Sequence, residues 1–179
     1  MSDAYDWSQF HVRMYYLASM DEVWRRFSTA RGLESFFIYA ATHTSADGKV
    51  RGADETVAAG DTYQWDYVHN YAHGGEFLEV VAREKVAFTF GSMRVDISFR
   101  AVDGAIEVDL HQTNCALEDP ERAWQHLNCR SCWIYFLTNL RSVLAGGPDV
   151  RDFEHPWWND SVGIGFDVAA GPGEPRARR

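Results

Sequence analysis

Glu79 is the one carboxylate in this sequence for which a catalytic role is considered. In the expected strand over residues 75–81 it alternates onto the same face as the apolar Phe77 and Val81. A carboxyl group inside an apolar cavity has a raised pKa and is suited to act as a general base. The plainer interpretation is a residue at the rim of the sheet, paired with an arginine. Glu79 is therefore kept as a candidate, and no other catalytic residue is assigned.

Two further patterns resemble reactive or metal-binding motifs. Cys129 and Cys132 form a C-x-x-C pair, but they fall in the middle of an expected helix, away from an N-terminus that would lower a thiol pKa. Asp66, His69 and His73 would share a face on a helix, but their segment alternates as a strand. We interpret the cysteines as core residues and the histidines as exposed or hydrogen-bonded. No metal site and no cofactor are expected.

An aromatic stripe is the third feature with a functional interpretation. Tyr63, Trp65 and Tyr67 alternate along the expected strand over residues 62–68, so their rings share one face. Such a stripe either fills a core or forms the wall of a pocket that stacks on a flat ligand. The sequence leaves both interpretations open.

The elements that position these residues follow from capping motifs and from alternation. Ser19 and Glu22 have the spacing of a capping box, which predicts a helix directly after the first strand, and a second short helix is expected over residues 31–36. Alternating apolar and polar residues with one dry face predict an antiparallel sheet covered on one side. The expected strands span residues 10–17, 37–42, 62–68, 75–81, 86–90, 94–102 and 105–113.

One long helix is expected to cover the sheet. Asp119 suits its N-cap, Pro120 its first position, and the Gly-Gly-Pro sequence of residues 146–148 its end. Its second half is strongly apolar, so Trp133 should be buried against the sheet. Its first half carries smaller and more polar residues, which predicts a cavity there. Residues 1–148 form the expected domain, and residues 149–179 an extension that docks in part and is otherwise disordered.

The order of these elements and several short motifs resemble a known family. Residues 12–37 resemble the opening of the START-like (SRPBCC) superfamily, where a strand leads into a helix beginning x-x-E-x-V-W. Residues 75–90 are similar to a hairpin of its branch of activator of heat-shock protein ninety ATPase homologues. Trp133, Leu137, Leu140 and Gly146 resemble that branch's closing helix. The resemblance implies an α+β helix-grip fold, with six or seven antiparallel strands curved around a long C-terminal helix.

The resemblance also implies a function, because superfamily members bind lipids, hormones and polyketide-like ligands between the helix and the sheet. We expect a small hydrophobic or aromatic ligand in that cavity. One alternative is an enzyme, cyclase- or hydrolase-like, with Glu79 or a histidine as base. Another is a co-chaperone-like interaction protein. The expected ligand-binding residues are Met14, Tyr63, Trp65, Tyr67, Phe77, Phe88, Ile97, Val108, Leu127, Asn128, Ser131 and Tyr135.

Composition and charge exclude other classes of partner. Lysine and arginine number 17 against 26 aspartates and glutamates, which gives a net charge of −9. An acidic chain is unsuited to nucleic acid or to anionic lipid. No apolar run is long enough to span a bilayer and the N-terminus has no signal-peptide pattern, so a cytoplasmic protein is expected. The sequence leaves open whether the domain acts alone or as a homodimer.

Overall fold

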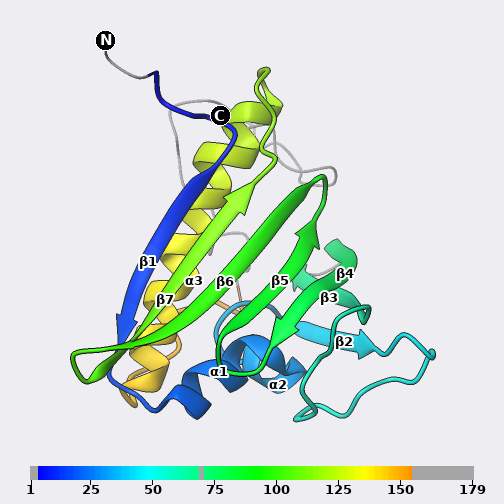
Figure 1. The fold of residues 1–179 in the computed structure, drawn as a ribbon, viewed down its shortest axis with the longest axis vertical. Coiled ribbons are helices and arrows are strands. Elements are labelled where there is room, and N and C mark those ends of the chain that lie inside the picture. The colour runs from blue at the N-terminus through cyan, green and yellow to red at the C-terminus, as the bar shows by residue number, and fades with distance from the viewer. Residues whose placement is uncertain (1–3, 69–70, 155–179) are drawn as a thin grey trace.

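A seven-stranded antiparallel sheet forms the body of the computed structural model, which describes residues 4–68 and 71–154. The strand order is β1-β7-β6-β5-β4-β3-β2, so the first strand pairs with the last (Figure 1). The strands are β1 (Phe10–Tyr16), β2 (Ala40–Thr44), β3 (Thr62–Val68), β4 (Tyr71–Val81), β5 (Lys85–Phe90), β6 (Met93–Val102) and β7 (Ala105–Thr113). Together with the helices described next, the sheet confirms the predicted α+β helix-grip fold.

Two short helices follow β1, as predicted. Helix α1 (Met20–Ser28) begins at the expected capping box, in which Glu22 N–H donates to Ser19 Oγ at 3.2 Å and Ser19 N–H donates to Glu22 Oε2 at 2.9 Å. Helix α2 (Ala30–Glu34) is capped by Thr29. A Cβ at Gly32 would lie 2.0 Å from the Arg25 carbonyl oxygen, so glycine is needed where α2 passes α1.

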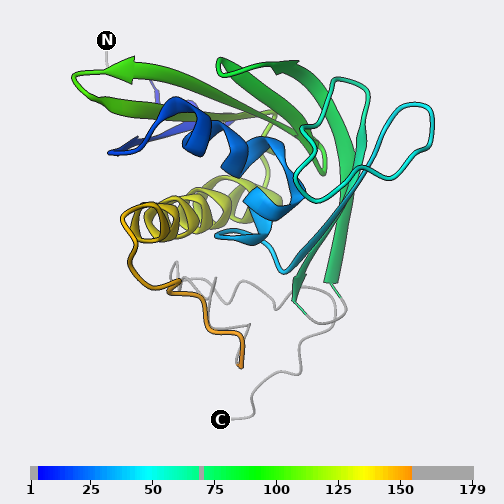
Figure 2. The same cartoon turned by 90° about the horizontal axis from the view of Figure 1, so that it is seen from below.

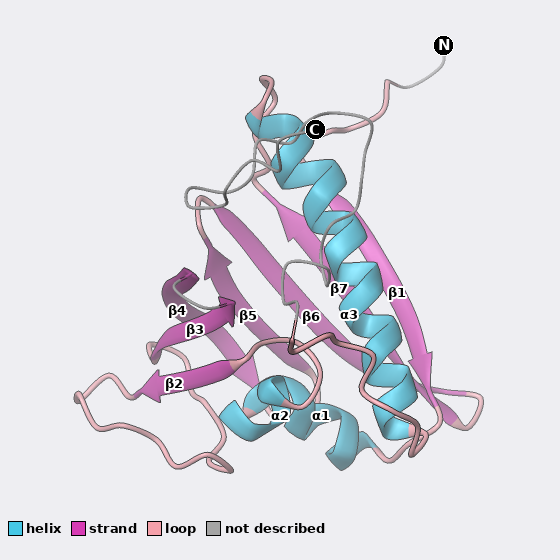
Figure 3. Ribbon diagram, turned by 180° about the vertical axis from the view of Figure 1, so that it is seen from behind, coloured by secondary structure: helices cyan, strands magenta, loops and turns pink. Residues whose placement is uncertain are grey.

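The long helix is not one uninterrupted α-helix as the sequence predicted. A π-helical segment, η1 (Ala123–Asn128), precedes α3 (Cys129–Leu144), and both lie across the inner face of the sheet (Figure 3). The Gln125 carbonyl accepts hydrogen bonds from Gln112 Nε2 at 3.0 Å and from Cys115 Sγ at 3.5 Å. Side chains that bond to a helical carbonyl in this way accompany irregular helix winding. At the start of this segment the Asp119 carboxylate accepts from the Arg122 guanidinium.

The core lies between the sheet and α3. The sheet-facing stripe of α3 consists of the buried residues Cys129, Trp133, Phe136, Leu137 and Leu140. Trp133 is 3% exposed, which confirms its predicted burial. Its indole N–H donates to Gln112 Oε1 at 2.9 Å, so this polar group is satisfied inside the core.

The chain after α3 returns to the body through Arg151. Its guanidinium donates to the Ile38 carbonyl at 2.9 Å and to the Glu34 carbonyl at 2.7 Å, and it pairs with the Asp149 carboxylate. The expected docking of Pro156–Trp158 lies outside the described residues. The division of the chain at residue 148 remains a prediction.

Candidate functional site

The aromatic stripe of β3 lines the inner face of the sheet. The rings of Tyr63 and Trp65 stack with centroids 3.8 Å apart and planes 19° apart, and both residues are buried. Tyr67, at the end of the stripe, is only half-buried. The stripe is therefore core at one end and partly accessible at the other.

An aromatic wall, formed by Phe37, Tyr67, Phe90, Trp133 and Phe136, continues from that accessible end onto α3. Phe37 lies at its centre, with ring centroids 4.8 Å from Trp133, 5.1 Å from Phe136 and 5.4 Å from Tyr67. Phe90 lies 5.9 Å from Trp133. Tyr67 and Phe90 are half-buried, whereas the other three rings are buried. The wall thus joins β3, β5 and α3 and exposes two of its rings in part.

The sheet curves so that these elements face one another. Figure 2 shows the β2–β4 side of the sheet turning around the side of α3, whose axis runs along the inner face. Of the five wall residues, the sequence analysis expected only Tyr67 to bind a ligand; it placed Trp133 in the core and gave the three phenylalanines no binding role. Phe90 was detectable, because in β5 it alternates onto the face of Phe88. Phe37 was expected at the start of a strand over residues 37–42, but it lies in the turn after α2, and β2 begins only at Ala40.

Other expected ligand-binding residues lie deeper in the molecule. Phe77, Phe88, Ile97 and Val108 are at most 3% exposed and are packed in the hydrophobic core. Met14 is half-buried against the same core. These side chains therefore belong to the core and not to an accessible binding surface.

The structure separates the expected helix residues from one another. Ser131 is two residues from both Cys129 and Trp133, about 200° around the helix from each, and so lies on the side away from the sheet. Leu127 lines a surface pocket described below. Tyr135 is half-buried, and its hydroxyl donates to the Val150 carbonyl at 3.1 Å. Asn128 is buried at the end of η1.

The expectation that Glu79 shares the inner face with Phe77 is wrong. The register of β4 shifts between these two residues: Phe77 pairs with Phe88, whereas Glu79 pairs with Ala87. This bulge turns Glu79 to the outer face, where Lys85 Nζ donates to its carboxylate at 2.7 Å. Its side chain is 44% exposed, with Arg94 at 3.6 Å. Glu79 is thus an ion-paired surface carboxylate, the plainer of its two interpretations.

Burial favours the neutral forms of Cys115, Cys129 and His43 in the core. Burial raises the pKa of Cys129 to about 12, and it also raises the pKa of Cys115. Burial lowers the pKa of His43 to about 4. Among residues 4–68 and 71–154, no three or more histidine, cysteine, aspartate or glutamate side chains are grouped where they could hold a metal ion. Within the same residues, no helix is long and apolar enough to cross a bilayer.

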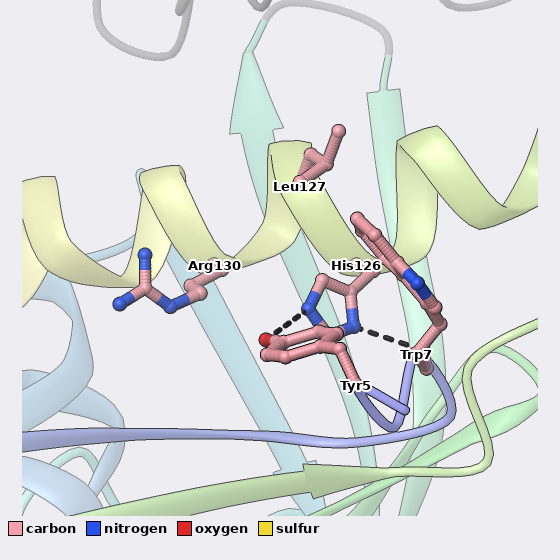
Figure 4. A pocket seen from close by; sticks show the side chains of 5 residues that line it. All are labelled: Tyr5, Trp7, His126, Leu127 and Arg130. Atoms are coloured by element: carbon pink, nitrogen blue, oxygen red, sulfur yellow. Dashed lines mark hydrogen bonds between the residues drawn. The ribbon is translucent and has the colours of Figure 1, made fainter. Parts of the chain in front are cut away.

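A separate surface pocket of about 300 Å³ lies beside η1 and the start of α3. Tyr5, Trp7, His126, Leu127 and Arg130 line it (Figure 4). Tyr5 and Trp7 precede β1, and the sequence analysis assigned them no role. A short aromatic segment before the first strand is the only signal that points to them.

An antiparallel sheet wrapped around a long C-terminal helix, with an aromatic inner wall, defines a helix-grip protein of the START-like superfamily. A family model described as "Activator of Hsp90 ATPase homolog 1-like protein" matches residues 17–145. The chain belongs to this family, which confirms the resemblance seen in the sequence. In a search of curated proteins, none matches this chain.

Solved structures show the same fold at low sequence identity. A protein from Staphylococcus saprophyticus is 18% identical with a TM-score of 0.62, over 78% of this chain and 93% of that one. The Aha1 dimer from Colwellia psychrerythraea is 15% identical with a TM-score of 0.60, over 76% of this chain and 95% of that one. DynU16, described as a putative protein in the dynemicin biosynthetic locus, is 16% identical with a TM-score of 0.62, over 79% of this chain and 49% of that one.

Proposed function

We propose that this protein binds a small apolar or aromatic molecule against the aromatic wall. The observation that carries the proposal is the partial exposure of Tyr67 and Phe90 beside the buried rings of Phe37 and Trp133. Apolar surface gains roughly 25 cal/mol for each Å² that a ligand removes from water. Flat rings at a concave face also favour an offset-stacked or edge-to-face aromatic partner.

Binding is favoured over catalysis in this proposal. The only carboxylate considered as a base, Glu79, lies on the outer face in a cluster with Lys85 and Arg94. The dynemicin-locus neighbour supports a role with small molecules rather than a particular reaction. A histidine is the other base considered, and the His73 ring lies 4.9 Å from the Phe90 ring of the wall. A cyclase- or hydrolase-like activity that uses His73 therefore remains the alternative to binding.

Binding of ANS, an aromatic dye that carries one sulfonate group, tests the proposal. The wild-type protein should bind the dye saturably, and Phe90→Ala should weaken binding because it removes an accessible ring of the wall. Tyr15→Ala is the matched control, since Tyr15 is 45% exposed on β1 and is not part of the wall. Equal dye binding by both variants and the wild type, or no binding by any of them, would contradict the proposal.

The homodimer and the cytoplasmic location expected from the sequence remain proposals. The Colwellia psychrerythraea structure is described as a dimer, which supports testing the oligomeric state here. Light scattering during size-exclusion chromatography distinguishes a monomer of 20.4 kDa from a dimer. A co-chaperone-like role is suggested only by the family description.

A further inference from the structure

The surface pocket beside η1 is built by a segment outside the family match. Tyr5 and Trp7 precede residue 17, where the match begins, whereas His126, Leu127 and Arg130 lie within it. His126 and Arg130 are four residues apart on the helical segment and so face the same side. The N-terminal segment lies along that side and forms one wall of this open surface pocket (Figure 4).

His126 fixes the aromatic part of the pocket. It is 1% exposed, and its ring lies edge-on to Tyr5 and Trp7 with centroids 5.4 and 5.1 Å away. Tyr5 and Trp7 are themselves 4.9 Å apart and edge-to-face. The rings therefore have a defined arrangement, although Tyr5 is 59% exposed. A preformed aromatic surface at the edge of solvent suits a flat ligand.

The hydrogen bonds of His126 define which of its nitrogens carries the proton. Its Nδ1 lies 2.9 Å from the Trp7 carbonyl oxygen, which only accepts, so Nδ1 donates. Burial lowers the pKa of His126, and the charge of Arg130 lowers it further. The ring is therefore neutral near pH 7, and Nε2 accepts from the Tyr5 hydroxyl at 2.8 Å. The Tyr5 oxygen can still accept a hydrogen bond from a ligand, but its proton is already donated to His126.

Among the five residues that line the pocket, Arg130 carries the charge. Arg130 forms no ion pair with any residue in the described part of the chain, whereas Arg122, which lies over the Trp7 ring at 5.4 Å, is paired with Asp119 at 2.9 Å. The nearby Asp6 carboxylate accepts from Ser8 and Gln9 instead. An aromatic cage of this kind would suit a cation, but the unpaired Arg130 opposes one.

We propose that this pocket binds a small planar aromatic carboxylate. Its ring would contact Trp7 and Tyr5, and its carboxylate would pair with the Arg130 guanidinium, which is suited to bidentate carboxylate binding. The volume of about 300 Å³ is at the small end for ligand pockets, which favours one or two rings. This site is independent of the aromatic wall.

Calorimetric titration with indole-3-carboxylate tests the site, with indole-3-carboxamide as the neutral probe of the same shape. The wild-type protein should bind the carboxylate saturably and the carboxamide at least roughly tenfold more weakly, because the charge-assisted pair is lost. Arg130→Gln should weaken carboxylate binding by a similar factor. Arg141→Gln, which removes an exposed arginine elsewhere on α3, should leave it unchanged.

Three results would overturn the proposal: no saturable carboxylate binding, equal binding of the two probes, or an Arg130→Gln affinity equal to wild type. Phe90→Ala separates this site from the aromatic wall. Carboxylate binding that survives Phe90→Ala supports the pocket even if the wall binds no dye. Carboxylate binding that is lost in Phe90→Ala and kept in Arg130→Gln would place the ligand at the wall and contradict the pocket.

Discussion

Protonation of His43 should destabilise the fold in mildly acidic solution. His43 is 1% exposed, and its Nε2 accepts a hydrogen bond from the Trp65 indole N–H at 3.2 Å. Because an indole N–H only donates, the neutral ring must carry its proton on Nδ1. Protonation would turn His43 Nε2 into a donor, so that two N–H groups would face each other where the Trp65 hydrogen bond is now. Burial lowers the pKa of His43 to about 4, against the opposing charge of Asp61.

The sign and size of the effect follow from proton linkage. In the unfolded chain His43 titrates at 6.5, so between about pH 6.5 and 4 the unfolded state binds more protons than the folded state. The contribution of neutral His43 to the free energy of unfolding is therefore fully present above this range, and it is lost as the pH falls through the range. For a shift from 6.5 to about 4, the loss between about pH 8 and pH 5 is roughly 2 kcal/mol.

Urea unfolding at these two pH values, in wild type and His43→Gln, measures the effect. The glutamine amide oxygen can accept from Trp65 but does not titrate, so the variant should lose roughly 2 kcal/mol less than wild type on acidification. The pKa values of His73, His111 and His126 are also lowered by burial, but they act in both proteins and cancel in the comparison. An identical pH dependence in the two proteins would show that His43 is not held neutral by the fold.

Three further predictions concern the core and the chain after α3. Trp133→Ala should lower the free energy of unfolding by about 3–5 kcal/mol, because it empties a buried indole site and leaves Gln112 without its donor; a loss below about 1 kcal/mol in urea melts would refute the assigned packing. Arg151→Ala should lower the melting temperature, since its guanidinium holds two backbone carbonyls of the body, and an unchanged calorimetric melt would show that this contact adds no stability. Cys129→Ala/Cys132→Ala should retain the native circular dichroism spectrum and the same metal content by elemental analysis, and stoichiometric zinc found only in the wild type would contradict a structural role for these thiols.

The sequence predicts the fold well because the features that specify it are local. The capping box at Ser19 and alternation in β6 and β7 each depend on neighbouring residues, and the structure has them at the predicted places. The hairpin at Asp103–Gly104 joins those strands with positive φ at both residues, as its turn chemistry requires. Such signals are readable without knowledge of the rest of the chain.

The site was harder to predict because it depends on irregularities and on distant contacts. A bulge between Phe77 and Glu79 reverses the face of Glu79, and no alternation rule reveals a shift in register. The π-helical winding of η1 depends on side chains of β7 and the following loop, and it changes which residues of the helix face the sheet. The contact between Tyr5 and His126 joins residues 121 positions apart, which no local pattern encodes.

The central claim, that a small apolar molecule binds at the aromatic wall, is tested most directly by mapping where such a molecule contacts the protein. Heteronuclear NMR spectra of the labelled protein, recorded during titration with ANS, provide that map. The account predicts the largest shift changes at Phe37, Tyr67, Phe90 and the Trp133 indole N–H, with Tyr15 on the outer face unchanged. Shift changes confined to the outer face of the sheet, or no saturable change at the wall, would contradict it.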